Sequence, residues 1–184
     1  MNKIFLLIVF AFVIAAGVGY FFSRSNLVEA PTNGGSFTVN SFKDCVKKGS
    51  PVMESYPPRC SFGGKTFTQN IGNELEMADL ITLTTPRPND LIKSPLRIEG
   101  QARGSWFFEA EGGRVMVLDE NGLELGGGSI QAQGEWMTDE FVLFEGKSIF
   151  DPKGANYGTL IIPNANPSDL PENSKELKIP VKFE

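Results

Sequence analysis

The chain has 184 residues, a net charge of −5 and 41% hydrophobic residues. This length suits one ordinary domain with small additions. A modestly acidic chain lacks the concentrated positive field that a nucleic-acid binder needs, so we expect no nucleic-acid partner. The sequence contains no histidine, which removes histidine-based triads, histidine-ligated zinc and the commonest general base near neutral pH. We therefore expect no enzymatic activity and no cofactor.

The N-terminal segment carries an uncharged apolar run from Ile4 to Phe22. A helix over this run would be about 30 Å long, the thickness of a bilayer core. Lys3 precedes the run, so the N-terminus should stay in the cytoplasm. We interpret residues 1–23 as a signal anchor, which makes a single-pass protein of the cell membrane with its C-terminal part outside the cytoplasm. A signal peptide cleaved near Ala30 is the alternative, and it exports the remainder as well.

Residues 24–39 are small and polar and are interrupted by proline and glycine, which predicts a linker. The following residues, 40–72, form a module that holds the only cysteines, Cys45 and Cys60. Outside the cytoplasm an even number of cysteines predicts a disulfide bond. Closing a loop of about 15 residues contributes about 3 kcal/mol of stability. Two thiols without histidine make only half of a zinc site, so we expect no metal.

The run from Asp44 to Phe67 resembles a short module that recurs in exported bacterial proteins. Its pattern is a cysteine, the sequence Gly-x-Pro-Val-Met-Glu-Ser-Tyr-Pro, a second cysteine and a Gly-x-Thr-Phe ending. The resemblance implies no activity. Lys43, Lys47 and Lys48 form a small basic patch near the cysteines, which we interpret as solvated surface.

Residues 79–184 have a different texture, in which short β-prone runs alternate with turn-forming residues. Seven or eight short strands without an amphipathic helix predict an all-β fold, an antiparallel β-sandwich. The pattern alone does not separate a sandwich from a small barrel. Asn121-Gly122 between two apolar runs predicts a hairpin, and Pro180 predicts that the last strand lies at an edge or carries a bulge. Strands are expected at 80–84, 96–102, 115–118, 123–125, 129–133, 140–144, 157–162 and 177–183.

Several stretches of this segment together carry a resemblance to a known family. They are Thr85-Pro86 with Asn89-Asp90, Ser94-Pro95-Leu96, the run from Gly100 to Glu109, the hairpin at 118–122, Asn166-Pro167-Ser168-Asp169 and Ile179-Pro180-Val181. On these residues the segment is similar to the immunoglobulin-like domain found in bacterial spore germination and sporulation proteins, and in many lipoproteins and anchored proteins. The resemblance implies an immunoglobulin-like antiparallel β-sandwich without catalytic residues.

The candidate binding surface lies in the densest aromatic cluster, at Trp106, Phe107 and Glu109. An aromatic ring there could stack on a sugar while Glu109 accepts hydrogen bonds from its hydroxyls. The alternative is that these rings fill the core. If the run is a strand, its side chains alternate between two faces. On that assumption we expect Trp106 and Phe108 to be buried and Phe107 to be exposed.

Two groups of carboxylates could carry other chemistry. Asp119, Glu120 and Asn121 could ligate calcium, but they lack the spacing of a calcium loop, so the sequence favours a plain turn. Glu109 and Glu111 could form a glycosidase pair, but no pocket can be inferred around them. We assign no metal and no catalytic residue.

Together these features predict a non-enzymatic, membrane-anchored binding or spacer protein of the bacterial cell envelope. Its partners would be the membrane, through the N-terminal helix, and a protein or cell-wall component. The alternative is a carbohydrate-binding module for peptidoglycan or another polysaccharide.

Overall fold

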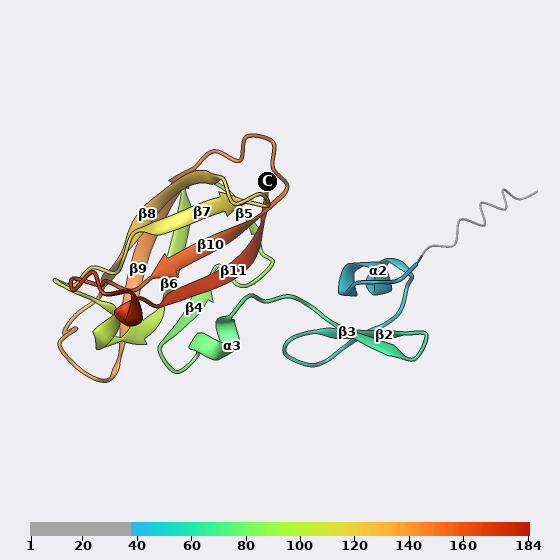
Figure 1. Ribbon diagram of the computed structural model, residues 1–184, viewed down its shortest axis with the longest axis horizontal. Coiled ribbons are helices and arrows are strands. Elements are labelled where there is room, and N and C mark those ends of the chain that lie inside the picture. The colour runs from blue at the N-terminus through green and yellow to red at the C-terminus, as the bar shows by residue number, and fades with distance from the viewer. Residues whose placement is uncertain (1–37) are drawn as a thin grey trace, which may run out of the picture. The chain divides into compact units, whose positions relative to one another are not determined.

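The computed structural model describes residues 38–184. The expected signal anchor and nearly all of the linker lie outside these residues. Within the described part, no helix is long and apolar enough to cross a bilayer. Residues 39–184 form one compact unit, which contains a small module followed by an all-β domain (Figure 1).

The module consists of helix α2 (Phe42–Lys47) and an antiparallel sheet of β1 (Val52–Met53), β2 (Arg59–Phe62) and β3 (Lys65–Thr68). Ser41 is the N-cap of the helix, and its Oγ accepts the Asp44 N–H at 3.1 Å. The Ser41 hydroxyl also donates to the Asp44 carboxylate, which is the main cause of the lowered pKa of Asp44. This reciprocal capping fixes the first turn of a helix that is too short to be stable by itself.

The predicted disulfide is confirmed. Cys45 of α2 and Cys60 of β2 are bonded, and both residues are fully buried. The only other buried apolar residue between residues 38 and 72 is Ile71. The disulfide therefore occupies the place that a hydrophobic core fills in a larger domain.

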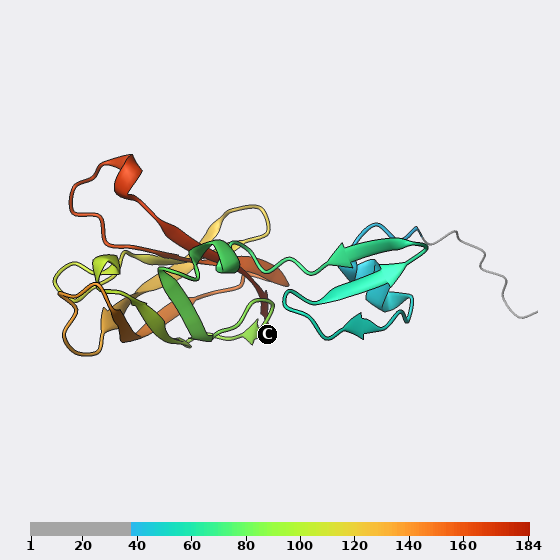
Figure 2. The same ribbon diagram turned by 90° about the horizontal axis from the view of Figure 1, so that it is seen from below.

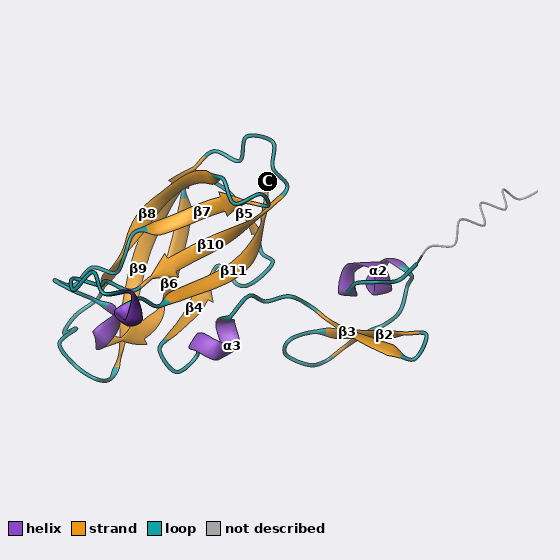
Figure 3. Ribbon diagram, in the orientation of Figure 1, coloured by secondary structure: helices purple, strands orange, loops and turns teal. Residues whose placement is uncertain are grey.

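The domain that follows contains eight strands and three short helical turns (Figure 3). The predicted strands at 123–125 and 129–133 are one continuous strand, the strand predicted at 140–144 extends to Phe150, and the strand at Leu91–Ile92 was not predicted. The other predicted strands are present with small shifts at their ends. The elements are α3 (Glu74–Met77), β4 (Ile81–Thr85), β5 (Leu91–Ile92), β6 (Leu96–Arg103), η1 (Gly104–Trp106), β7 (Val115–Asp119), β8 (Glu124–Ala132), β9 (Phe141–Phe150), β10 (Tyr157–Pro163), η2 (Pro171–Asn173) and β11 (Glu176–Phe183).

The strands are hydrogen-bonded in the order β4-β6-β9-β8-β7-β10-β11-β5. Figure 1 shows β7, β10 and β11 lying over the layer that contains β6, β8 and β9. Strand β8 joins the layers, because Gly126, Gly127 and Gly128 pair with both β7 and β9. A Cβ on Gly128 would lie 1.8 Å from the Lys147 carbonyl oxygen, so only glycine permits this close approach.

One hydrophobic core lies between the two layers. Alternate residues of β6 and β11 are buried, as a half-buried strand requires. Ile98 and Phe144 from one layer share a single buried cluster with Leu160 and Ile179 from the other. The alternation that predicted these strands also predicted which of their side chains form the core.

Pro180 lies on the outer side of β11, as its missing N–H requires. The Pro180 carbonyl accepts the Asn89 N–H at 2.6 Å, and the Lys182 N–H donates to Asp90 on the same side. That side has only the two-residue β5 as a sheet partner, which pairs with Lys182 and Phe183. The strand therefore has the near-edge position that the proline predicts.

The segment between the module and the sandwich is fixed to β11. The Asn73 side chain donates to the Glu176 carbonyl at 2.8 Å and accepts the Lys178 N–H at 2.7 Å. The next residue, Glu74, is buried and pairs with Arg87 Nη1 at 2.7 Å. Burial raises the pKa of the Glu74 carboxyl, and the Arg87 guanidinium opposes that shift.

Candidate binding surface

Three loops meet at one end of the sandwich, which we call the loop end. They are residues 104–114, 133–140 and 164–175, which follow β6, β8 and β10 respectively. Backbone hydrogen bonds connect the 104–114 loop to the other two, from the Gly104 N–H to the Glu140 carbonyl and from the Ala165 N–H to the Trp106 carbonyl. The Ala132 N–H, at the end of β8, also donates to the Ala110 carbonyl. The loop end is therefore held by the ladders of the sandwich and by bonds between its own loops.

The aromatic run does not continue β6 as a strand, so our expectation for Phe107 and Phe108 is wrong. Gly104–Trp106 forms the 3-10 turn η1, and the Phe107 N–H closes it by donating to the Gly104 carbonyl at 3.1 Å. A 3-10 turn rotates successive side chains by about a third of a turn, whereas a strand alternates them. Trp106 and Phe107 consequently both point inward.

Burial gives the opposite assignment for the two phenylalanines. Phe107 is 4% exposed and contacts Phe144 edge-on, with ring centroids 6.3 Å apart. Phe108 is 47% exposed. The burial of Trp106, at 2% exposure, agrees with our expectation. Two of the three predicted surface residues, Trp106 and Phe107, therefore belong to the core, and the exposed ring is the one we expected to be buried.

Glu109 lies in a tight turn that holds Phe108 outward. Glu109 and Ala110 have φ values of +50° and +67°, a left-handed conformation that non-glycine residues adopt uncommonly. Backbone hydrogen bonds between Phe108 and Glu111 close the turn, at 2.8 and 3.0 Å. Glu109 is exposed, as a binding role would require.

The 164–175 loop is cross-connected by hydrogen bonds from its polar side chains to one another and to its backbone. Asn166 Nδ2 donates to the Leu170 carbonyl and to Ser174 Oγ, each at 2.9 Å. Asn164 receives the Lys175 N–H at 2.8 Å. Figure 2 shows η2 on this loop, which projects away from the strands. The sequence Asn166-Pro167-Ser168-Asp169 is thus a structural turn motif.

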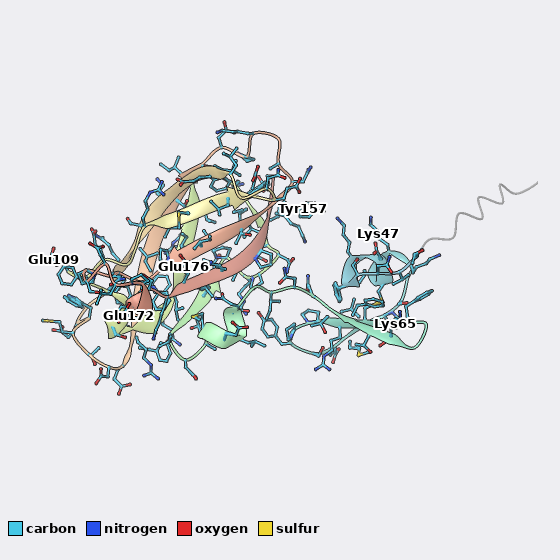
Figure 4. The ribbon with its side chains drawn as sticks, in the orientation of Figure 1. Lys47, Lys65, Glu109, Tyr157, Glu172 and Glu176 are labelled. Carbon is cyan, nitrogen blue, oxygen red and sulfur yellow. A yellow bond between two sulfur atoms is a disulfide. The ribbon has the colours of Figure 1, made fainter. Side chains whose placement is uncertain are left out.

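Three shallow clefts are hollowed into the loop end. One, of about 440 Å³, is lined by Phe108, Glu109, Glu111, Gly112 and the 165–167 segment. A second, of about 400 Å³, shares that segment and reaches Trp106, Glu172 and Lys175. A third, of about 310 Å³, is lined by Phe107, Trp136 and Met137 among others. In Figure 4, Glu109 and Glu172 mark this end of the sandwich.

The carboxylates that could have held calcium form a turn. Asp119 Oδ1 accepts the N–H groups of Asn121 and Leu123, both at 2.8 Å. The hydrogen bond from Leu123 is the largest cause of the lowered pKa of Asp119. Glu111, the other half of the suggested glycosidase pair, accepts a hydrogen bond from Gln131 at 3.2 Å. Among residues 38–184, no cluster of three or more acidic or cysteine side chains could hold a metal ion.

Comparison with known proteins identifies the sandwich. Residues 80–170 match the Gmad2 family, described as the immunoglobulin-like domain of bacterial spore germination. The sandwich domain belongs to this family. No curated protein and no solved structure matches the chain.

The match to Gmad2 ends at residue 170, whereas the domain continues to β11. Strand β11 pairs with β10 from Tyr157 to Pro163 and supplies buried Leu177, Ile179 and Val181. The Gmad2 sandwich of this chain is therefore complete only with its last strand. The matched region includes the buried rings of Trp106 and Phe107 and the exposed ring of Phe108.

Proposed function

We propose that this protein is a non-enzymatic binding module of the bacterial cell envelope, held at the outer face of the cytoplasmic membrane by residues 1–23. Its loop end engages a protein or a cell-wall component. The observation that carries the proposal is the exposure of one large apolar side chain on each loop: Phe108 at 47%, Met137 at 73% and Leu170 at 49%. Exposed apolar groups on loops that a hydrogen-bonded scaffold positions are typical of recognition surfaces.

Two further observations support a binding role in this compartment. The Cys45–Cys60 disulfide is typical of proteins outside the reducing cytoplasm. The described residues also contain no histidine, no free cysteine and no cluster of metal ligands. Among the described residues, a catalytic pair based on histidine or a free cysteine therefore has no source.

Carbohydrate binding is the second candidate, and the cleft at Phe108 favours it. This cleft combines an exposed aromatic ring with the carboxylates of Glu109 and Glu111. Aromatic stacking with hydrogen-bond acceptors at its rim is the combination that a sugar ring requires. Peptidoglycan is the polysaccharide that this location would offer.

The membrane anchor has a direct test. Full-length protein should fractionate with membranes and stay there after carbonate extraction, because the 4–22 run matches the hydrocarbon thickness. A soluble form whose first residue is near Ala30 or Pro31 would contradict the anchor and leave only export.

Binding at the loop end is tested by sedimentation of the full-length protein, in mild detergent, with purified peptidoglycan. Phe108→Ser should weaken co-sedimentation by about tenfold or more, because an interface aromatic commonly carries 1–2 kcal/mol or more. Ile149→Ser is the matched control, since Ile149 is 65% exposed on β9, outside the loop end. The assay is repeated with peptidoglycan from which the bound proteins have been removed. Binding that persists indicates the glycan as partner, and binding that is lost indicates a wall-bound protein. Equal losses for the two variants would disprove a role of the loop end.

A further inference from the structure

A separate cleft of about 630 Å³ lies between helix α2 and the start of β10, away from the loop end. Figure 4 labels two of its residues, Lys47 on α2 and Tyr157 on β10. Residues 39–184 form one compact unit, so these elements belong to the same body. The lining residues are Ser41, Phe42, Lys43, Val46, Lys47, Thr68, Gln69, Asn70, Asn89, Tyr157 and Lys182.

The lining is cationic in a chain that is acidic overall. It includes Lys43, Lys47 and Lys182 and no aspartate or glutamate. Within the described residues, none of these three lysines forms an ion pair with a carboxylate at 4.0 Å or less. The nearest acidic group on the same helix, Asp44, already accepts hydrogen bonds from Ser41 and the Asn40 N–H. The charge of Asp44 still interacts with that of Lys47, but no carboxylate among the described residues forms a direct ion pair with the three lysines of the cleft.

Two of the three lysines are direct neighbours of Tyr157, because Lys182 is its cross-strand partner on β11 and Lys43 contacts it from α2. Lys43 Nζ donates to the Tyr157 hydroxyl at 2.7 Å and lies 4.5 Å from the centre of its ring. The hydrogen bond from Lys43 is the largest cause of the lowered pKa of Tyr157, and the charges of Lys182 and Lys47 act in the same direction. Tyr157 thus holds one ammonium group in place while two others lie within electrostatic reach.

The other lining groups suit a sugar better than a bare ion. A volume of about 630 Å³ lies within the range of organic-ligand sites, about 300–1,000 Å³. Tyr157 and Phe42 provide partly exposed rings. The side chains of Thr68 and Gln69 make no hydrogen bond within the part of the chain that the structure describes, so both can bind hydroxyl groups.

We propose that this cationic cleft binds an acidic glycan, through carboxylate or phosphate groups carried on its sugar rings. The lysines supply charge-assisted hydrogen bonds to the acid, and the rings and polar side chains contact the sugar. The site is independent of the loop end, and it does not require the proposed function to be correct.

The test is titration of the full-length protein, in neutral detergent, with trigalacturonate and with uncharged maltotriose. Trigalacturonate should bind at least about tenfold more tightly, and its affinity should fall as salt shortens the Debye length from about 30 to about 10 Å. The double variant K43Q/K182Q should lose about tenfold or more. K65Q/K147Q is the control, because it removes the same charge from one exposed module residue and one exposed sandwich residue outside the cleft.

Inorganic phosphate and phosphatidylglycerol vesicles are titrated as well, because they carry a negative charge without an acidic sugar. Binding to vesicles or phosphate without binding to trigalacturonate would overturn the assignment to a glycan. So would equal affinity for maltotriose, or equal losses in the two double variants. F108S should bind trigalacturonate normally, so a failure at the loop end and a failure at the cationic cleft can be told apart.

Discussion

Replacing Phe107 by alanine is expected to unfold or severely destabilise the sandwich, whereas the same change at Phe108 should leave its melting nearly unchanged. Phe107 is 4% exposed and packs against Phe144. Truncating a buried phenylalanine costs about 3–5 kcal/mol, against a total stability of about 5–15 kcal/mol. For a domain of about 100 residues this lowers the Tm by more than about 10 °C.

Phe108 is the internal control, because it is adjacent in sequence and identical in chemistry but 47% exposed. Surface substitutions usually change stability by no more than about 0.5 kcal/mol. Thermal melts of F107A and F108A, followed by circular dichroism, compare the two directly. A larger destabilisation in F108A than in F107A would contradict the inward position of Phe107.

Removing the disulfide has the second large expected effect, and it should be confined to the module. In C45S/C60S the 15-residue separation between the cysteines is no longer closed, which costs about 3 kcal/mol. The module has no sizeable apolar core to replace the lost cross-link. We therefore expect helix α2 and strands β1 to β3 to lose most of their protection from hydrogen exchange.

The sandwich should keep its melting temperature in C45S/C60S, because its 21-residue buried cluster contains no residue of the module. Hydrogen exchange followed by mass spectrometry resolves the two regions in one experiment. Treating the parent protein with reductant is the control and should reproduce the change. Unaltered exchange across residues 42–68 would show that the module does not depend on its disulfide.

The sequence predicted the sandwich well because its strands are long enough to alternate. Ile98 and Ile179 are buried in the structure, and each occupies the core-facing parity of its own run. Such local patterns need no knowledge of distant contacts. The disulfide was predictable from composition. The chain has two cysteines and no histidine, and in an exported protein this combination favours a disulfide over a metal site.

The candidate surface was misassigned because the prediction extended the alternation of buried and exposed side chains beyond Arg103, where strand β6 ends. Gly104 and Ser105 interrupt the β-prone run before Trp106, and turn-forming residues there were the available warning. The left-handed conformations of Glu109 and Ala110 could not be anticipated, since neither residue favours them. The structure therefore exchanges the roles of Phe107 and Phe108.

Helix α2 and the cationic cleft were missed for different reasons. Ser41 and Asp44 have the spacing of an N-terminal capping motif, so a local signal for the helix was present. The contact between Lys43 and Tyr157 joins residues that are 114 positions apart in the chain, and it brings Lys43 next to Lys182, the cross-strand partner of Tyr157. A single sequence contains no local pattern that predicts such a contact. The lysines of α2 were therefore interpreted as solvated surface residues.

The most direct test of the binding role of the loop end is hydroxyl-radical footprinting of the full-length protein with and without purified peptidoglycan. Oxidation of Met137 and Phe108 should fall on binding, because both side chains lie exposed on the loop end. Met53 is the reference, since it is 44% exposed in the module. Protection of Met137 and Phe108 with unchanged Met53 is the expected result. Unchanged oxidation of Met137 and Phe108 in protein that co-sediments with peptidoglycan would contradict the account.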